Sequence, residues 1–233
     1  MGYLIALFLL ILLSVVLLFL MKKFTNRRLT NFLFVLTIFF SYVALVIHVY
    51  RQVGANDWNF RNTLPTANVS PFMFCILPLA LLPGRIGRTL KTLVSLLTVG
   101  MFLSPTFSCI YYASIHYKFH ASFLLDFYAH FALCLWGIYL VRSGQVTPTV
   151  KESLIGGSII VAVALVMMAL SAIFDVSYFG LSLRGKHNIY NQVLTSSSAL
   201  SALLYFVGLI GVLVLGFLVA KIWERRKIPD ASR

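Results

Sequence analysis

Long apolar runs separated by short clusters of Lys and Arg constrain this chain more than any other feature. About 20 apolar residues in a helix cross the hydrocarbon core of a bilayer. Seven runs approach or exceed that length: Tyr3–Met21, Leu29–Tyr50, Thr66–Pro83, Thr89–Tyr112, Phe123–Val141, Leu154–Phe174 and Ser198–Lys221. The sequence therefore predicts an all-α bundle of about seven transmembrane helices. It forms a single multi-pass membrane domain over residues 1–233, with a short polar tail at 224–233.

Composition excludes an ordinary soluble domain. Of the 233 residues, 60% are hydrophobic and 11% are charged, and the mean hydropathy is +0.93. Soluble domains contain about 45–50% apolar and about 25% charged residues. The net charge of +13 is spread over clusters between apolar runs, which is how membrane topology is encoded. We therefore expect membrane lipids as partners, and no nucleic acid.

The basic residues also predict the orientation of the bundle. With the N-terminus outside and the C-terminus in the cytoplasm, the inner segments hold fourteen Lys and Arg and the outer segments hold five. Cytoplasmic loops carry the excess of Lys and Arg in membrane proteins. This bias supports an odd number of crossings in the cell membrane.

The third run is the exception among the seven. Pro71, Pro78 and Pro83 interrupt it, and its purely apolar part is short. Proline removes a helix hydrogen bond and breaks a helix interior. A broken or half-inserted helix is therefore an alternative to a full crossing. On the last run, Gly208, Gly211 and Gly216 favour close packing between helices.

On this topology, the polar residues other than Lys and Arg gather on the outer side. All five histidines fall on the outer half, together with Asp57, Asp126, Asp175 and several asparagines. This asymmetry predicts a site facing the outer leaflet, although interfacial histidines also occur without a function. The expected ligand-binding residues are His48, His116, His120, Asn188 and Asn191.

Asp126 and His130 are the strongest candidates in that group for a catalytic pair. Asp126 is the only acidic residue within an apolar run, and ionisable groups inside the membrane are costly unless they face the bundle interior with a partner. A spacing of four residues places both side chains on one helical face. The carboxylate then orients the imidazole as a general base. A structural hydrogen bond between helices is the alternative interpretation.

Ser70 is the first candidate nucleophile, because it lies where the third run enters from outside. A hydroxyl becomes a useful nucleophile only with a base in hydrogen-bond reach, and His130 is predicted at similar depth. Cys75, about a turn deeper, is the second candidate, and Asn68 is a candidate oxyanion donor. The alternative for Ser70 is a helix N-cap ahead of Pro71.

A metal site is not expected from the histidine spacing. His116, His120, Asp126 and His130 resemble a ligand run, but fourteen residues of helix span about 21 Å. If they share one helix, they cannot all reach one ion, and a zinc site would need one pair together with His48 or His187. Neither a metal nor another cofactor is therefore expected.

Several motifs resemble the YwaF-like integral membrane proteins of bacteria, which are similar to an animal transmembrane acyltransferase that acts on ether phospholipids. The motifs are Leu64-Pro65, Cys75-Ile76-Leu77-Pro78-Leu79-Ala80-Leu81-Leu82, Ser104-Pro105, Phe127-Tyr128-Ala129-His130 and Asn188-Ile189-Tyr190-Asn191. The resemblance implies a Leu-Pro motif followed by a His and a Cys, with a distant His in the fifth helix. His130 matches the distant histidine, whereas Ala67, Asn68 and Ser70 stand around the places of the expected His and Cys. Either Ser70 replaces a Cys nucleophile, or this chain keeps the fold without the chemistry.

These observations favour a membrane acyltransferase or lipid hydrolase. In it, Ser70 or Cys75 attacks a lipid ester, His130 acts as base, Asp126 orients it and Asn68 donates to the oxyanion. The alternative is non-enzymatic: a transporter, or a subunit that binds a membrane protein partner and keeps a buried Asp-His pair. A seven-helix zinc amidase of the ceramidase-like type fits least well, because only His187 lies late in the chain.

Overall fold

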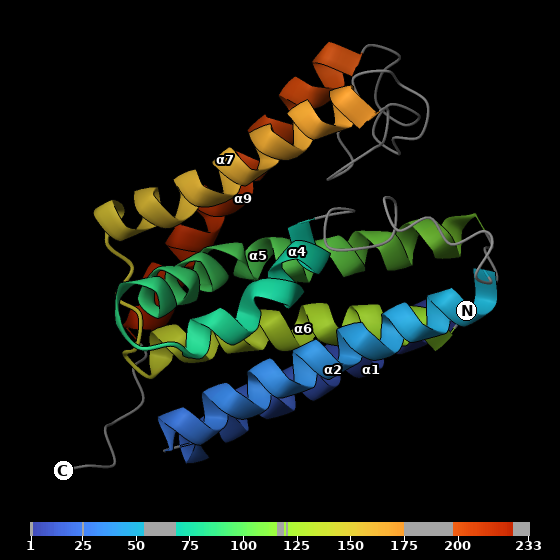
Figure 1. Ribbon diagram of the computed structural model, residues 1–233. Helices are drawn as coiled ribbons and strands as arrows, with labels where there is room; N and C mark the ends of the chain where they lie inside the picture. Colours follow the sequence, from blue (N-terminus) through green and yellow to red (C-terminus); the bar gives the residue numbers. More distant parts are fainter. Residues whose placement is uncertain are drawn as a thin grey trace.

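The computed structural model describes residues 2–24, 26–53, 69–115, 119, 121–174 and 198–225. Within these ranges the chain is helical and contains no strand. The helices are α1 (Gly2–Leu20), η1 (Met21–Lys23), α2 (Arg27–Val53), α4 (Val69–Ile76), η2 (Leu77–Leu81), α5 (Gly84–Ser114), α6 (Ala121–Arg142), α7 (Val150–Phe174) and α9 (Ser198–Glu224). Figure 1 shows them as a bundle, with α7 and α9 forming a pair along one side. The predicted all-α membrane bundle is confirmed.

Six of these helices are long and apolar enough to cross a membrane: α1, α2, α5, α6, α7 and α9. The most hydrophobic of them are the least buried, since α1 and α9 expose most of their side chains while α6 is largely covered. A soluble protein shows the opposite pattern, because water drives apolar residues inward. The exposed apolar faces therefore identify lipid as the solvent of a multi-pass membrane protein.

The third predicted crossing is a short, broken element, as the alternative interpretation proposed. α4 and η2 together contain 13 residues, which extend about 22 Å against a hydrocarbon core of about 30 Å. Pro78 stands at the start of η2 and cannot continue the α-helical hydrogen bonds of α4. In Figure 1, α4 begins near the middle of the bundle and leads toward the end where α5 begins.

Local signals set the ends of several helices. Asn26 Oδ1 accepts a hydrogen bond from Leu29 N at 3.1 Å and caps α2. Thr149 Oγ1 does the same for Glu152 N at 3.2 Å at the start of α7, and the acidic Glu152 suits this first turn. After α6, Gly144 adopts φ +70°, a conformation that glycine adopts at little cost and that often ends helices.

The two ends of the bundle differ in chemistry, one being basic and the other aromatic. In Figure 1, α1 begins at one end and α9 finishes at the other. The end with the start of α2 and the finish of α6 carries Lys23, Arg27, Arg28, Arg85, Arg88, Arg142, Lys151, Lys221 and Arg225. This basic end corresponds to the predicted cytoplasmic face. The opposite end carries aromatic rings that pack against one another, including Tyr3, Tyr112 and Phe123, and aromatic residues are enriched at membrane interfaces.

Helix α6 lies at the centre and holds its neighbours through buried polar groups near the basic end. Trp136 Nε1 donates to Asn31 Oδ1 of α2 at 3.0 Å, and Tyr139 Oη donates to the carbonyl of Phe24 at 3.0 Å. Arg142 Nη1 donates to the carbonyl of Leu18 at 3.2 Å. These bonds hold α6 in place, and with it the site described next.

Candidate functional site

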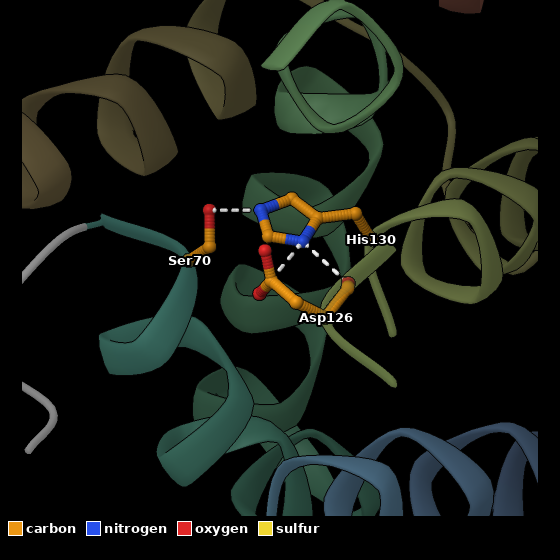
Figure 2. A network of polar contacts seen from close by, with 3 residues as sticks. All are labelled: Ser70, Asp126 and His130. Atoms are coloured by element: carbon orange, nitrogen blue, oxygen red, sulfur yellow. Dashed lines mark hydrogen bonds and ion pairs between the residues drawn. The ribbon is translucent and has the colours of Figure 1, made fainter. Parts of the chain in front are cut away.

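Ser70, His130 and Asp126 meet in the interior of the bundle. His130 Nε2 lies 2.7 Å from Ser70 Oγ. His130 Nδ1 lies 2.8 Å from the main-chain carbonyl oxygen of Asp126 and 3.4 Å from its carboxylate oxygen Oδ1. Figure 2 shows the imidazole between the two residues, with Ser70 on one side and Asp126 on the other. The structure thus brings together the three residues predicted to act as nucleophile, base and orienting acid.

These groups come from two helices, α4 and α6. Ser70 precedes His130 by 60 residues in the chain. His130 and Asp126 lie one turn apart on α6. Ser70 lies in the first turn of α4, which begins at Val69, so its hydroxyl is inside the helix rather than at the residue before it. Phe74, one turn further along α4, packs its ring edge-on against His130 with centroids 5.3 Å apart. It also contacts Tyr42 of α2, with centroids 5.6 Å apart.

The hydrogen bonds decide which imidazole nitrogen carries the proton. A main-chain carbonyl only accepts, so the short bond to Asp126 O requires a proton on Nδ1. In the neutral ring, Nε2 is then the unprotonated nitrogen and accepts the hydroxyl proton of Ser70. This is the tautomer that a general base needs to activate a serine.

The three residues differ in burial and in depth along the bundle. Ser70 is 9% exposed and His130 is 5% exposed, whereas the Asp126 side chain is 32% exposed. Counting along α6 from its start at Ala121, Asp126 lies about 8 Å and His130 about 14 Å from the end opposite the basic end. Asp126 is thus the most exposed of the three residues, and it lies in the half of the bundle predicted to be the outer one.

Cys75 has a different neighbour. Its thiol lies beside the Tyr42 hydroxyl of α2, and among the described residues His130 is hydrogen-bonded to Ser70 and Asp126 but not to Cys75. Ser70, not Cys75, is therefore the group that the histidine can deprotonate in this arrangement.

Other candidate residues lie outside the described part of the chain. They are Asn68, His116, His120, Asn188 and Asn191, and the Leu64-Pro65 motif lies there too. For His48 the structure describes the backbone in α2 but not the side chain. Among the residues that are described, no group of three or more His, Cys, Asp or Glu side chains is arranged to hold a metal ion.

The sequence reasoning missed Phe74 and Tyr42, which hold α4 against α2 and α6. Their only signal in the sequence is position: Phe74 follows Ser70 by four residues and so lies on the same helical face.

Comparison with known proteins adds no relative. No protein-family model matches the chain, and neither a curated protein nor a solved structure is significantly similar to it.

Proposed function

We propose that the protein is a membrane-embedded, serine-dependent acyltransferase or lipid hydrolase of the cell membrane, with a site open toward the outer leaflet. The observation that supports this most strongly is the 2.7 Å contact between Ser70 Oγ and His130 Nε2, in a ring whose other nitrogen donates to a carbonyl. The motifs that resemble YwaF-like proteins support the proposal only if Ser70 replaces the Cys expected in that family; otherwise this chain keeps the fold without the chemistry.

The first step is attack of Ser70 Oγ on the carbonyl carbon of a lipid ester. The hydroxyl proton moves to His130 Nε2 as the new C–O bond forms. The Asp126 carboxylate, close to Nδ1, stabilises the imidazolium that results. N–H groups in the first turn of a helix have no partner within the helix. Pro71 has no N–H, so the Ser70 N–H is the donor that α4 offers to the oxyanion, together with the predicted donor Asn68.

The second step releases the alcohol and then the acyl group. The imidazolium returns its proton to the departing alcohol, which leaves an ester on Ser70. Water or a second lipid alcohol then attacks that ester while Nε2 takes its proton, and Nε2 returns the proton to Ser70 Oγ as the bond between Oγ and the acyl carbon breaks. Water completes a hydrolysis, whereas a lipid alcohol completes an acyl transfer.

The test combines a covalent probe with lipid analysis. A fluorophosphonate probe should label the wild type in membranes and should fail to label Ser70→Ala and His130→Ala. Untargeted lipidomics should show a change in acyl chains or lysolipids that both variants abolish. The matched control is Ser41→Ala, because Ser41 is also 9% exposed but its hydroxyl is bonded to the carbonyl of Thr37 in its own helix. Unchanged labelling in Ser70→Ala, at equal protein levels, would contradict the proposal.

A second candidate is proton-coupled transport or a subunit role in a membrane complex. The observation that favours it is the depth of the Asp126–His130 pair, since His130 lies close to the middle of a helix about 33 Å long. Transporters bind their substrates near the bilayer midplane. In that case Asp126→Asn abolishes uptake while Ser70→Ala retains it, and the probe labels neither. A subunit would instead co-purify with a stoichiometric membrane protein partner.

A further inference from the structure

Phe74 connects the two helices of the serine site through a ring contact. It lies four residues after Ser70, on the same face of α4, and its side chain is fully buried. Its ring packs edge-on against the His130 imidazole, with centroids 5.3 Å apart and an angle of 87° between the planes. The imidazole therefore contacts α4 at two points one turn apart: Nε2 meets the Ser70 hydroxyl, and the ring meets Phe74.

The position of α4 depends on such side-chain contacts, because the backbone does not fix it. α4 contains eight residues, too few to cross the membrane alone, and Pro78 breaks the helix between α4 and α5. A single hydrogen bond between membrane helices contributes little, whereas buried aromatic rings contribute strongly to packing. The ring of Phe74 therefore does more than the Ser70–His130 bond to set the distance between α4 and α6.

Tyr42 of α2 is the next ring in this contact. Its centroid lies 5.6 Å from that of Phe74, and its side chain is 5% exposed. Its hydroxyl lies beside the Cys75 thiol but has no hydrogen-bond partner at regular geometry among the described residues. Tyr42 therefore contributes its ring to this contact, and the hydroxyl is dispensable for it.

The imidazole needs support because rotation of a histidine ring about χ2 is soft. A half-turn of the ring would place carbon atoms where Nδ1 and Nε2 now make their bonds. The bond from Nδ1 to the carbonyl of Asp126 opposes this rotation from within α6. Phe74 opposes it from α4, the helix that carries the serine.

We propose that Phe74 is a positioning residue: braced by the Tyr42 ring, it holds the His130 imidazole with Nε2 directed at Ser70. As a role in the reaction this rests on the proposed serine chemistry. The positioning itself can be measured without any reaction of a lipid.

The first test replaces the Ser70 hydroxyl by a thiol, in a variant whose three native cysteines are replaced by Ser. Purified Ser70→Cys is treated with methyl methanethiosulfonate, and its rate of modification at pH 7 is divided by the rate at pH 9. A thiol paired with an imidazole is ionised at both pH values, so this ratio should be near one. An unpaired thiol has a pKa of about 8.5, so adding His130→Ala should lower the ratio about 20-fold. Exposure of the thiol affects both rates equally and cancels in the ratio.

In the same background, Phe74→Leu should lower the ratio about 5-fold or more, because the imidazole no longer stays on the thiol. The matched control is Phe131→Leu, since Phe131 is 2% exposed, follows His130 directly and packs edge-on against Phe102 at 5.6 Å. The control should leave the ratio unchanged. An unchanged ratio in Phe74→Leu, or equal falls in both variants, would overturn the proposal. So would a ratio for Ser70→Cys no higher than the one with His130→Ala.

Two variants of Tyr42 keep the proposal testable if Phe74→Leu does not fold. Tyr42→Leu should lower the ratio, because it removes the ring that braces Phe74. Tyr42→Phe should keep the ratio, because it removes only the hydroxyl. A fall in Tyr42→Phe, or none in Tyr42→Leu, would overturn the role of the ring.

Fluorophosphonate labelling separates this inference from the proposed function. With Ser70 and the native cysteines in place, Phe74→Leu should lower the maximal labelling rate about 10- to 100-fold, while the probe concentration at half-maximal rate stays unchanged. If the wild type is not labelled but the thiol ratios behave as expected, the serine chemistry fails and the positioning stands. If the wild type is labelled and Phe74→Leu leaves the thiol ratio unchanged, the positioning fails and the proposed function stands.

Discussion

At the residue scale, the main-chain carbonyl of Asp126 fixes the tautomer of His130, a role that a carboxylate has in most serine triads. In those triads the acid fixes the tautomer and the orientation of the histidine, and its removal lowers kcat about 10⁴-fold. Here the 2.8 Å bond to Asp126 O already places the proton on Nδ1. The carboxylate at 3.4 Å is left with the stabilisation of positive charge on the ring.

Replacing Asp126 should therefore cost less than replacing the histidine. Because alanine keeps the carbonyl, we expect Asp126→Ala to lower the rate of fluorophosphonate labelling about 10- to 100-fold, while His130→Ala abolishes it. Labelling rates of the purified variants measure both effects. Equal losses in the two variants would show that the side chain, not the main chain, sets the tautomer.

The Ser70–His130 contact should contribute little to stability. Hydrogen bonds between transmembrane helices are worth about 0.6 kcal/mol on average. We therefore expect Ser70→Ala to unfold within about 1 kcal/mol of the wild type in a detergent-denaturation series. A loss of several kcal/mol would indicate that the contact is structural, and the loss of labelling would then not report chemistry.

Much of this site was predictable from spacing and depth. The interval of four residues places Asp126 and His130 on one face in any helix, and the predicted topology places Ser70 at similar depth. The carbonyl bond of His130 was not predictable, because it depends on the rotamer of the ring. The contacts of Phe74 with Tyr42 and His130 depend on how α4 packs, which the sequence pattern does not specify.

At the element scale, the glycines of α9 show how packing selects among equivalent residues. The sequence offers Gly208, Gly211 and Gly216 as candidates for close packing. A Cβ added at Gly216 would lie 1.7 Å from the main-chain oxygen of Leu96 in α5, whereas one added at Gly208 or Gly211 meets nothing within 4 Å. All three glycines lie in the same apolar helix, so the sequence does not distinguish them. Only Gly216 lies where α9 crosses the backbone of α5.

Gly216→Ala should accordingly separate α5 from α9. The clash is with backbone, which cannot move aside as a side chain can, and overpacking of this kind costs about 1–3 kcal/mol. Gly208→Ala should be neutral or slightly stabilising, because alanine is the better helix former. Thermal unfolding of the two variants in one detergent measures the difference, and equal midpoints would contradict the crossing geometry.

At the scale of the whole molecule, the segment between α2 and α5 must bring the chain from one end of the bundle back to the other. α2 finishes at the end opposite the basic end, and α5 begins at the basic end. The described part of this segment, α4 with η2, runs from near the middle of the bundle toward the basic end (Figure 1). The three prolines of the third run predicted a broken or half-inserted helix as an alternative to a full crossing, but not that the break would fall at Pro78, at the start of η2.

The two ends should therefore differ in accessibility. In a background with Cys75, Cys109 and Cys134 replaced by Ser, a membrane-impermeant maleimide should label Ser114→Cys in intact cells and should label Arg225→Cys only after lysis. Both positions are exposed in the structure, so burial does not account for a difference. Labelling of both positions from outside would contradict the predicted orientation.

The brevity of α4 has a consequence for biogenesis. Insertion machinery recognises segments by hydrophobic length, and the 13 residues of α4 and η2 together fall short of the length that a lone helix needs. During synthesis, His130 of α6 is added 60 residues after Ser70. The hydrogen bond between the hydroxyl and the imidazole therefore forms only after α6 has been made. The Ser70–His130 contact thus forms by tertiary folding, and a nascent chain arrested before α6 has every residue of α4 but no imidazole beside Ser70.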